Sequence, residues 1–369
     1  MKIAFVCPTP PPYGGITNWS KMLIAYLENT SKDQIYVINT SPKSRTADGR
    51  TLFDRIFGGL AVAIRASREF KSLLKRDSPD IVHVTTSGGL GLFRDVLVLE
   101  IARRAKIPAV YHVHYGKIPQ TLASGGFEAS LLRASLRLCT TAIAIDRATE
   151  SSIRDTGLCE VVYIGNPVDV YKLKDVCRKT RGESKNTVIF LGWVVETKGI
   201  RELMDAWDSV STAFPDWQLT LVGPYDSNRI DALVNKSRHS GVSLVGELSH
   251  DEAMERLCKA SILVLPSYSE GFPNVVLEAM VYGKAVLATS VGALPDLLGD
   301  GRGVLVEPRS SIQISDGLKK LMNDDVLRTS LGERAERFVK ENFDIAVVAN
   351  RYRLLWTRLV SERHLTDEK

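Results

Sequence analysis

The stretch SILVLPSYSEGFPNVVLEAMVYGKAVLAT, residues 261–289, combines two apolar runs with a helix-like segment between them. The runs 261–267 and 284–289 predict short buried strands. Pro273 suits the start of a helix because its missing N–H would be unbonded there, and Gly283 is typical of a helix end. Two strands joined by a helix indicate a parallel strand–helix–strand unit.

The same alternation runs through the chain. Apolar runs predict strands at 2–7, 34–40, 80–86, 108–114, 141–146, 161–166, 187–193, 217–223, 242–246, 261–267, 284–289 and 303–308. Amphipathic segments such as 16–29 and 57–76 predict helices between them. Strands that alternate with helices predict an α/β fold of doubly wound parallel sheets.

The length of 369 residues and the 44% hydrophobic content fit two domains better than one core. We expect Rossmann-like domains over 1–168 and 169–345 that face a cleft, with a linker near 168–184. The segment 346–369 predicts a final helix that returns to the first domain.

The chain carries a formal net charge of +5, and the excess is confined to its first part. Residues 1–165 hold 21 Lys and Arg against 14 Asp and Glu, a balance of +7. Such a surface could meet an anionic membrane or an anionic substrate, and solvated helix faces are an equally good explanation. Because the sequence has no dense basic cluster, we expect no nucleic-acid partner.

The five cysteines are scattered and have no metal-ligand spacing, which indicates buried thiols in a reducing cytoplasm. The first apolar run is too short for a signal peptide, and no run is long enough to span a membrane. We therefore expect a cytoplasmic protein that could associate peripherally with the inner face of the membrane.

Two glutamates flank the predicted start of the helix in the opening stretch. Glu270 lies in the turn, and Glu278 lies about 8 Å along the helix axis. The free amides between them form an anion site. A nucleotide sugar would fit, with Glu270 on sugar hydroxyls, the amides on the diphosphate and Glu278 on the ribose. The alternative is that the two residues bind no ligand: Glu270 would then be a charge near the helix cap, and Glu278 a solvated helix residue.

The segments EGFPNVVLEAM, GKAVLAT and VGALPDLL resemble the signature of the retaining GT-B glycosyltransferases of the large family four type. The resemblance covers nearly the whole chain. It implies that Glu270 and Glu278 bind the sugar and the ribose of the donor. It also implies a catalytic role for Lys198, which would neutralise the diphosphate, and for His114, which would contact the donor sugar.

Other positions match the family less closely. The family has Gly-Arg where this chain has Gly192 and Trp193, so Arg201 is a candidate substitute for the missing cation. His112 lies on the same strand face as His114, and we interpret it as a core residue, with a paired-histidine metal site as the alternative. The complete set of expected donor-binding residues is Gly14, Gly15, Gly192, Lys198, Gly223, Gly246, Leu248, Glu270, Gly271, Phe272, Pro273, Asn274 and Glu278.

These patterns and the resemblance predict an enzyme that moves a sugar from a nucleotide donor to an acceptor hydroxyl. The resemblance implies retention of configuration, which the spacing does not show. The sequence has no Asp-x-Asp motif, so we expect neither a bound metal nor another cofactor. We expect a UDP-sugar rather than a GDP-sugar as donor, and a lipid-linked or oligosaccharide acceptor in surface polysaccharide synthesis. A sugar-nucleotide epimerase and a non-catalytic nucleotide-sugar-binding subunit remain as alternatives.

Overall fold

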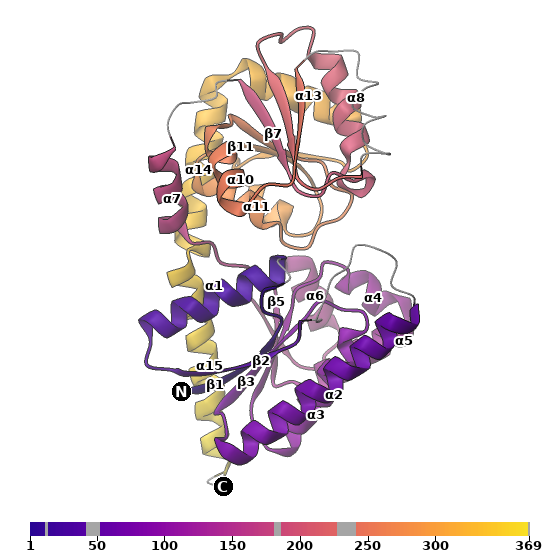
Figure 1. The fold of residues 1–369 in the computed structure, drawn as a ribbon, viewed down its shortest axis with the longest axis vertical. Helices are drawn as coiled ribbons and strands as arrows, with labels where there is room; N and C mark the ends of the chain where they lie inside the picture. The colour runs from indigo at the N-terminus through magenta and orange to yellow at the C-terminus, as the bar shows by residue number, and fades with distance from the viewer. Residues whose placement is uncertain (12–13, 42–51, 181–185, 227–240, 368–369) are drawn as a thin grey trace. The chain divides into compact units, whose positions relative to one another are not determined.

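The computed structural model describes residues 1–11, 14–41, 52–180, 186–226 and 241–367. The chain divides into two compact units. Unit 1 comprises Met1–Pro167 and Ile345–Lys369, and unit 2 comprises Val168–Asp344. Pro12, Tyr13 and the 181–184 end of the expected linker lie outside the described residues. Each unit is built around one parallel sheet (Figure 1).

Unit 1 contains a six-stranded sheet in the order β2-β1-β3-β4-β5-β6. Its strands are β1 (Lys2–Cys7), β2 (Gln34–Asn39), β3 (Ile81–Thr86), β4 (Ala109–Val113), β5 (Thr141–Ala144) and β6 (Glu160–Tyr163). Its helices are α1 (Gly15–Thr30), α2 (Leu52–Arg76), α3 (Gly91–Arg104), α4 (Ile118–Ser124), α5 (Phe127–Leu138), α6 (Arg147–Asp155) and α15 (Ile345–Asp367). Strands β3, β4 and β5 are buried along their whole length, as expected for a parallel sheet covered on both faces.

Unit 2 repeats the plan with the strand order β12-β11-β10-β7-β8-β9. Its strands are β7 (Thr187–Leu191), β8 (Gln218–Val222), β9 (Val242–Gly246), β10 (Ile262–Leu265), β11 (Ala285–Thr289) and β12 (Val304–Val306). Its helices are α7 (Val170–Lys179), η1 (Glu196–Lys198), α8 (Ile200–Val210), α10 (His250–Lys259), α11 (Asn274–Val281), α12 (Leu294–Leu298), α13 (Ser311–Asn323) and α14 (Asp325–Phe343). All strand pairings in both sheets are parallel, which confirms the predicted α/β class.

Within the linker expected near 168–184, Val170–Lys179 form helix α7, which the sequence analysis did not predict. The Asp169 side chain caps this helix by accepting a hydrogen bond from the amide of Lys172, 2.9 Å away. Val170 and Leu173 are buried, so α7 packs an apolar face. Pro167 and the charges that follow it indicated a linker, while local capping and packing produce a helix.

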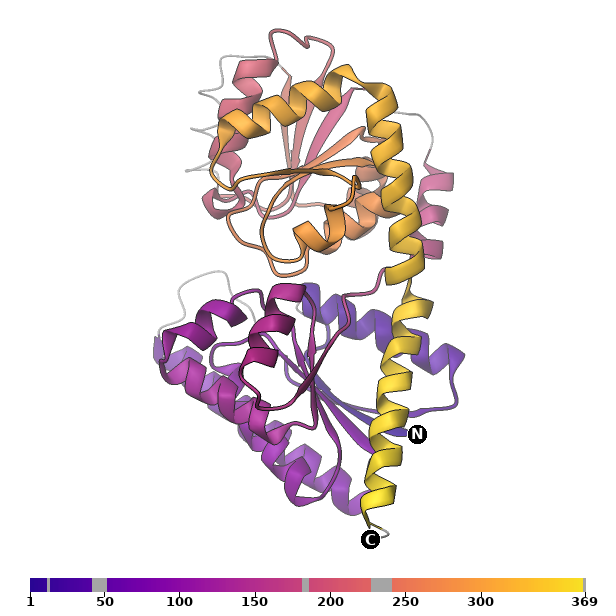
Figure 2. The ribbon, with the colours of Figure 1, turned by 180° about the vertical axis from the view of Figure 1, so that it is seen from behind.

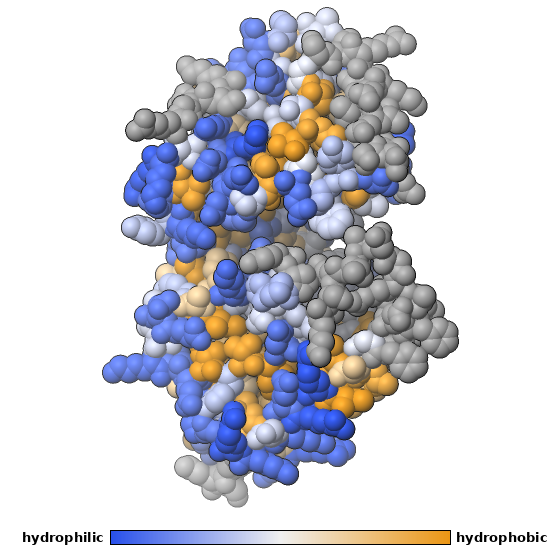
Figure 3. All heavy atoms as spheres, viewed as in Figure 1, coloured by the Kyte–Doolittle hydropathy of each residue, from blue (hydrophilic) through white to orange (hydrophobic). Residues whose placement is uncertain are grey.

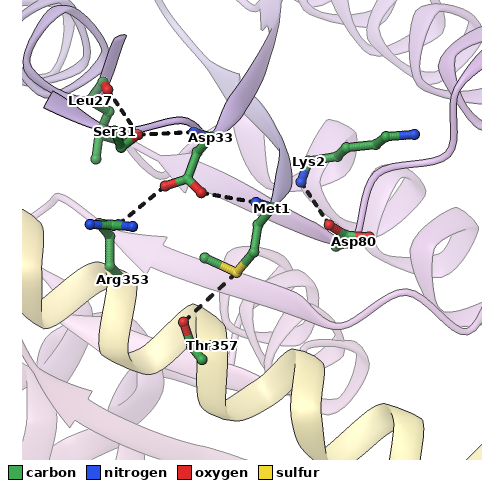
Figure 4. A network of polar contacts seen from close by, with 8 residues as sticks. All are labelled: Met1, Lys2, Leu27, Ser31, Asp33, Asp80, Arg353 and Thr357. Atoms are coloured by element: carbon green, nitrogen blue, oxygen red, sulfur yellow. Dashed lines mark hydrogen bonds and ion pairs between the residues drawn. The ribbon is translucent and has the colours of Figure 1, made fainter. Parts of the chain in front are cut away.

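The last helix, α15, completes unit 1 (Figure 2). It contributes Tyr352 and Trp356 to a buried cluster with residues of β1 and α1. Polar contacts fix the same helix at its surface, since Arg353 contacts Asp33 at 3.2 Å (Figure 4). Asp33 also accepts a hydrogen bond from the Met1 amino group, 2.9 Å away, so one carboxylate joins α15 to the start of β1.

The expectation of five buried thiols is wrong for two cysteines, because Cys177 of α7 and Cys258 of α10 form a disulfide. Sequence alone could not show this pair, since the two residues are 81 positions apart. Cys7 and Cys139 are buried thiols, and Cys159 is half-buried.

Among the helices of the described ranges, none is both long and apolar enough to cross a membrane.

Candidate active site

Lys198 and Glu270 form the centre of the site in unit 2. Lys198 ends η1, which follows β7, and its Nζ lies 2.6 Å from Oε1 of Glu270. Glu270 lies in the turn after β10, and the hydroxyl of Ser267 donates a second hydrogen bond to the same oxygen at 2.6 Å. Glu270 is only 11% exposed at its side chain, so the cation and the hydroxyl hold its carboxylate in one place.

Close backbone approach fixes the two loops that carry this pair. The amide of Tyr268 donates to the carbonyl of Thr197 at 3.0 Å, which joins the turn after β10 to η1. Gly199 has a φ of +70°, and a Cβ there would lie 2.0 Å from the carbonyl oxygen of Pro266. Only glycine fits this position, so the loops are set by backbone packing rather than by side chains.

The turn that contains Glu270 is held from the other side by the loop after β11. Gly292 has a φ of +56°, and a Cβ there would lie 2.2 Å from the Glu270 carbonyl oxygen. The amide of Ala293 donates to the carbonyl of Gly271 at 2.9 Å. Next along the chain, the Phe272 ring packs against that of Phe343 with centroids 5.7 Å apart.

Helix α11 starts at Asn274, so the expectation that Pro273 is its first residue is wrong by one position: Pro273 is the N-cap. The helix carries no acidic residue in its first turn, which leaves its positive end uncompensated from within the helix. Glu278 lies in the second turn and is 15% exposed at its side chain. It is therefore not a freely solvated helix residue.

Glu278 has a partner that the sequence did not reveal. Nε2 of His250, the first residue of α10, lies 3.0 Å from Oε1 of Glu278. The hydrogen bond with Glu278 raises the pKa of His250 above its ordinary value. The sequence does place His250 shortly after the predicted strand 242–246. Ligand-binding side chains of α/β folds lie at such carboxyl ends of strands, and this position is the feature that could have indicated His250.

Glycines line the ends of three neighbouring strands in unit 2. The amide of Gly192, after β7, donates to the carbonyl of Val222 at 3.0 Å. The amide of Gly223, after β8, donates to the carbonyl of Gly246 at 2.8 Å. A Cβ on Gly223 would lie 1.9 Å from the Gly192 oxygen. These three expected donor-binding glycines are therefore brought together at one edge of the sheet. Leu248 follows at the same edge and is half-buried.

Trp193 stands where the family has an arginine, and its side chain is 63% exposed. Arg201, the candidate replacement, lies 3.5 Å from Glu196 in an exposed ion pair. Lys198 contacts Glu270 directly, while Arg201 has an acidic partner outside that pair. The described contacts thus leave Lys198 as the cation at the centre of the site.

The expected site residues of unit 1 lie at the carboxyl edge of its own sheet. Gly15 begins α1 and Gly14 is its N-cap. Among the described residues, a Cβ on Gly15 would meet no atom within 4 Å. His114 follows β4, its amide donates to the Thr86 carbonyl at 3.0 Å, and its ring packs edge-on against Trp19 with centroids 4.8 Å apart.

His112 belongs to the core, as we interpreted it. It is fully buried, and its Nδ1 lies 3.1 Å from Nε2 of His83, which is also fully buried. Burial lowers the pKa of His83 and that of His114 to about 3, and it lowers the pKa of His112 well below its ordinary value. Within the described residues, no group of three or more His, Cys, Asp or Glu side chains could hold a metal ion.

Two similar α/β units, each with polar and glycine residues at the carboxyl ends of its strands, define a protein of the GT-B class. Residues 174–338 match the family model described as "Glycosyl transferases group 1", and residues 13–172 match "Glycosyltransferase Family 4". The chain belongs to the family-four type of glycosyltransferases and is a glycosyltransferase enzyme with the GT-B fold.

Named relatives agree with this assignment. An uncharacterized glycosyltransferase of Methanocaldococcus jannaschii is 28% identical over 296 residues, which are 77% of each chain. TuaC of Bacillus subtilis, provisionally named a teichuronic acid biosynthesis glycosyltransferase, is 26% identical over 295 residues, 76% of this chain and 71% of that protein.

Solved structures show the same fold. Sucrose-phosphate synthase from Thermosynechococcus elongatus has a TM-score of 0.77 at 18% identity and covers 98% of this chain and 99% of its own. HepE of Anabaena in complex with UDP has a TM-score of 0.72 at 17% identity, with coverages of 97% and 100%. The same protein in complex with UDP-glucose has a TM-score of 0.67 at 18% identity, with coverages of 97% and 100%.

Proposed function

We propose that the enzyme binds a nucleotide sugar in unit 2 and transfers its sugar to an acceptor hydroxyl. The main observation in support is the contact between Lys198 and Glu270, which lies at the carboxyl edge of the sheet next to the start of α11. Glu270 would accept hydrogen bonds from the sugar and Glu278 from the ribose, with the diphosphate between them. The UDP and UDP-glucose complexes of HepE favour a UDP-sugar as donor.

The diphosphate would be neutralised by Lys198 and by the first amides of α11. Asn274 begins this helix, and its first turn contains no carboxylate that would oppose an anion. Gly271, Phe272 and Pro273 lead directly into the helix and would form the wall beside the phosphates. We propose that transfer needs no metal ion and no other cofactor.

We propose retention of configuration through attack on the face that the nucleotide leaves, with the leaving phosphate accepting the proton of the acceptor hydroxyl. Stabilisation of that phosphate by Lys198 would supply much of the rate enhancement. His114 would contact the donor sugar through its Nε2, which is buried and has no hydrogen-bond partner among the described residues. Gly14 and Gly15, at the start of α1, would let the leaving phosphate and the acceptor approach the backbone closely.

We propose a lipid-linked or oligosaccharide acceptor of surface polysaccharide synthesis, and contact of unit 1 with the inner face of the membrane. Unit 1 exposes large apolar side chains on α2, α3 and α5, which pack together, and Figure 3 shows apolar surface in orange on this unit. They are Leu60 and Ile64 of α2, Leu90 and Phe93 at the start of α3, and Phe127 of α5. Arg68 and Lys71 are exposed further along α2, so apolar and basic groups lie together, as interfacial helices require.

Thermal unfolding with UDP-sugars and GDP-sugars in the presence of EDTA tests the donor site. A donor at 100 times its Kd stabilises a protein by about 2.7 kcal/mol. We expect one nucleotide sugar to raise the midpoint of the wild type without metal, and we expect Glu278→Ala and Lys198→Ala to lose that rise. Equal rises in both variants would contradict the assigned residues. No rise with any donor would contradict the donor site.

Two further measurements test the stereochemistry of transfer and the contact with the membrane. The anomeric configuration of the product, measured by NMR, tests retention, and an inverted product would overturn same-face attack. Sedimentation with vesicles that contain anionic lipid tests membrane contact. We expect Phe127→Ser together with Leu60→Ser to reduce the bound fraction and leave donor binding unchanged, because both side chains belong to unit 1.

A further inference from the structure

We propose that His250 is a positioning residue for Glu278 and fixes the carboxylate that recognises the ribose of the donor. The observation is the 3.0 Å contact between Nε2 of His250 and Oε1 of Glu278. The proposal deepens the proposed function and rests on it, because it takes the ligand of Glu278 to be a ribonucleotide. It does not depend on the base or on the sugar.

The backbone holds His250 in a fixed place. Ser249 precedes it as the N-cap of α10 and shares a capping box with Glu252. The amide of Ser249 donates to the Glu252 carboxylate at 2.9 Å, while its hydroxyl accepts from the Glu252 amide at 3.3 Å. These reciprocal bonds fix the first turn of α10, so the imidazole is presented to α11 from a rigid helix start.

The contact leaves Glu278 able to bind a diol. A carboxylate has two oxygens with about four acceptor sites, and His250 uses one of them. Among the described residues, Oε2 of Glu278 has no hydrogen-bond partner, so it stays open to a ribose hydroxyl. Held at one oxygen, Glu278 would not have to lose rotamer freedom when the nucleotide binds, and that loss otherwise weakens binding.

The surrounding charges make His250 the donor of this contact. Asp251 lies on its other side, with Oδ1 at 3.8 Å from Nδ1. The positive charge of Lys172 in α7 lowers the pKa of His250, and the hydrogen bond with Glu278 outweighs this effect. Tyr282, one turn beyond Glu278, has a buried hydroxyl without a hydrogen-bond partner in the described part of the chain. The hydrogen bond that positions the Glu278 carboxylate thus comes from His250 of α10.

The test compares ribonucleotide affinity with that of the 2′,3′-dideoxy form, which lacks both hydroxyls that Glu278 would bind. The ligands are UDP and GDP with their dideoxy counterparts, measured by calorimetry on the full chain. We expect His250→Ala to weaken ribonucleotide binding by about three- to tenfold and to leave the dideoxy form nearly unchanged. His250→Gln, whose amide can still donate, should restore most of the affinity.

A double-mutant comparison separates positioning from a direct or purely structural role. On a Glu278→Ala background, His250→Ala should cause no further loss, because the carboxylate it positions is gone. Glu255→Ala, an exposed change on the same helix, is the matched control and should change neither affinity. Steady-state kinetics should show a raised KM for the donor with kcat unchanged, as for an interaction made equally in the ground and transition states.

The outcomes are distinct. An equal loss for the ribose and dideoxy ligands in His250→Ala would overturn the proposal, because it would show a general loosening of the site. A further loss on the Glu278→Ala background would also overturn it, because His250 would then contact the nucleotide itself. Wild-type protein that binds the ribose and dideoxy forms equally would contradict the ribose role of Glu278, and failure to bind any nucleotide would contradict the donor site.

Discussion

Lys198 and Glu270 are 72 positions apart in the chain, yet Nζ of one lies 2.6 Å from Oε1 of the other. The sheet order explains the contact. Strands β7 and β10 are neighbours in a parallel sheet, so the loops after them emerge side by side at the carboxyl edge. The pairing of β7 with β10 therefore brings the Lys198 cation and the Glu270 carboxylate into contact.

Loss of the cation should reduce catalysis far more than stability. We expect Lys198→Ala to lower kcat by about 100-fold, since removal of one group that stabilises developing charge costs about 10²–10³ in rate. The free energy of unfolding should fall by about 1 kcal/mol or less, because Lys198 is 27% exposed and Ser267 still donates to Glu270. Donor-dependent transfer and urea unfolding measure the two effects.

Arg201→Ala is the control for that experiment, because this cation pairs with the exposed Glu196. We expect it to retain most of the wild-type kcat. If Arg201→Ala were as inactive as Lys198→Ala, the missing arginine at Trp193 would be replaced by Arg201, and our assignment of Lys198 as the central cation would be incomplete.

Two glycine substitutions should behave in opposite ways. Gly223→Ala would place a Cβ 1.9 Å from the Gly192 carbonyl oxygen at a φ of +141°, so we expect a loss of about 3 kcal/mol or more in the free energy of unfolding. Gly15→Ala adds a Cβ that meets no atom within 4 Å in the described part of the chain, and we expect unchanged or slightly higher stability. Urea unfolding of both variants checks this contrast.

The activity of Gly15→Ala then reports on function alone. If Gly15 borders the approach of a substrate, transfer should fall although the fold is intact. A fully active Gly15→Ala enzyme would show that the Gly-rich turn serves only the chain reversal before α1, and the proposed contact of Gly15 with the leaving phosphate or acceptor would be wrong.

The sequence predicted the strands well for a simple physical reason. Buried parallel strands such as Ile262–Leu265 are continuous apolar runs, and that pattern is local. Candidate site residues in the turns after these strands could also be predicted, because ligands of this fold class bind at the carboxyl ends of strands. Spacing and resemblance therefore predicted site roles for Lys198 and Glu270, and the structure brings the two side chains into contact.

Two of the missed features depend on contacts between distant segments, and the third, helix α7, has a local cause. His250 lies beside Glu278 only because α10 and α11 are packed together, and the sequence gives no measure of that distance. Cys177 and Cys258 pair across 81 positions for the same reason. Helix α7 was missed because its apolar face is short, while Pro167 and the later charges are typical of a linker.

The buried histidines of unit 1 should make the protein sensitive to acid. His83 and His112 are fully buried, and burial lowers the pKa of His83 to about 3. The unfolded chain binds these protons below a pKa of about 6.5 and the folded chain does not, so stability is complete above that pH and falls as pH decreases. Burial also lowers the pKa of His114 to about 3, so three such groups cost about 4 kcal/mol per pH unit between pH 6.5 and about 3.

Urea unfolding of the wild type at pH 7 and pH 5 checks this slope. The double variant His83→Leu and His112→Leu should lose about two thirds of this slope, because only His114 keeps a pKa lowered by burial. His364→Gln changes an exposed histidine of α15 and should keep the wild-type slope. An identical acid slope in the double variant would show that other groups cause the sensitivity.

The Cys177–Cys258 disulfide should stabilise unit 2 by joining α7 to α10 across 81 positions. Closing a loop of that length restricts the unfolded chain, and we expect reduction to lower the free energy of unfolding by about 2–4 kcal/mol. Thermal unfolding with and without dithiothreitol measures the effect, and Cys177→Ala together with Cys258→Ala should reproduce it. Cys159→Ala, a half-buried free thiol, should leave the response to dithiothreitol intact. Thiol titration of the denatured, unreduced protein should count only Cys7, Cys139 and Cys159; titration of all five cysteines would show that the disulfide does not form.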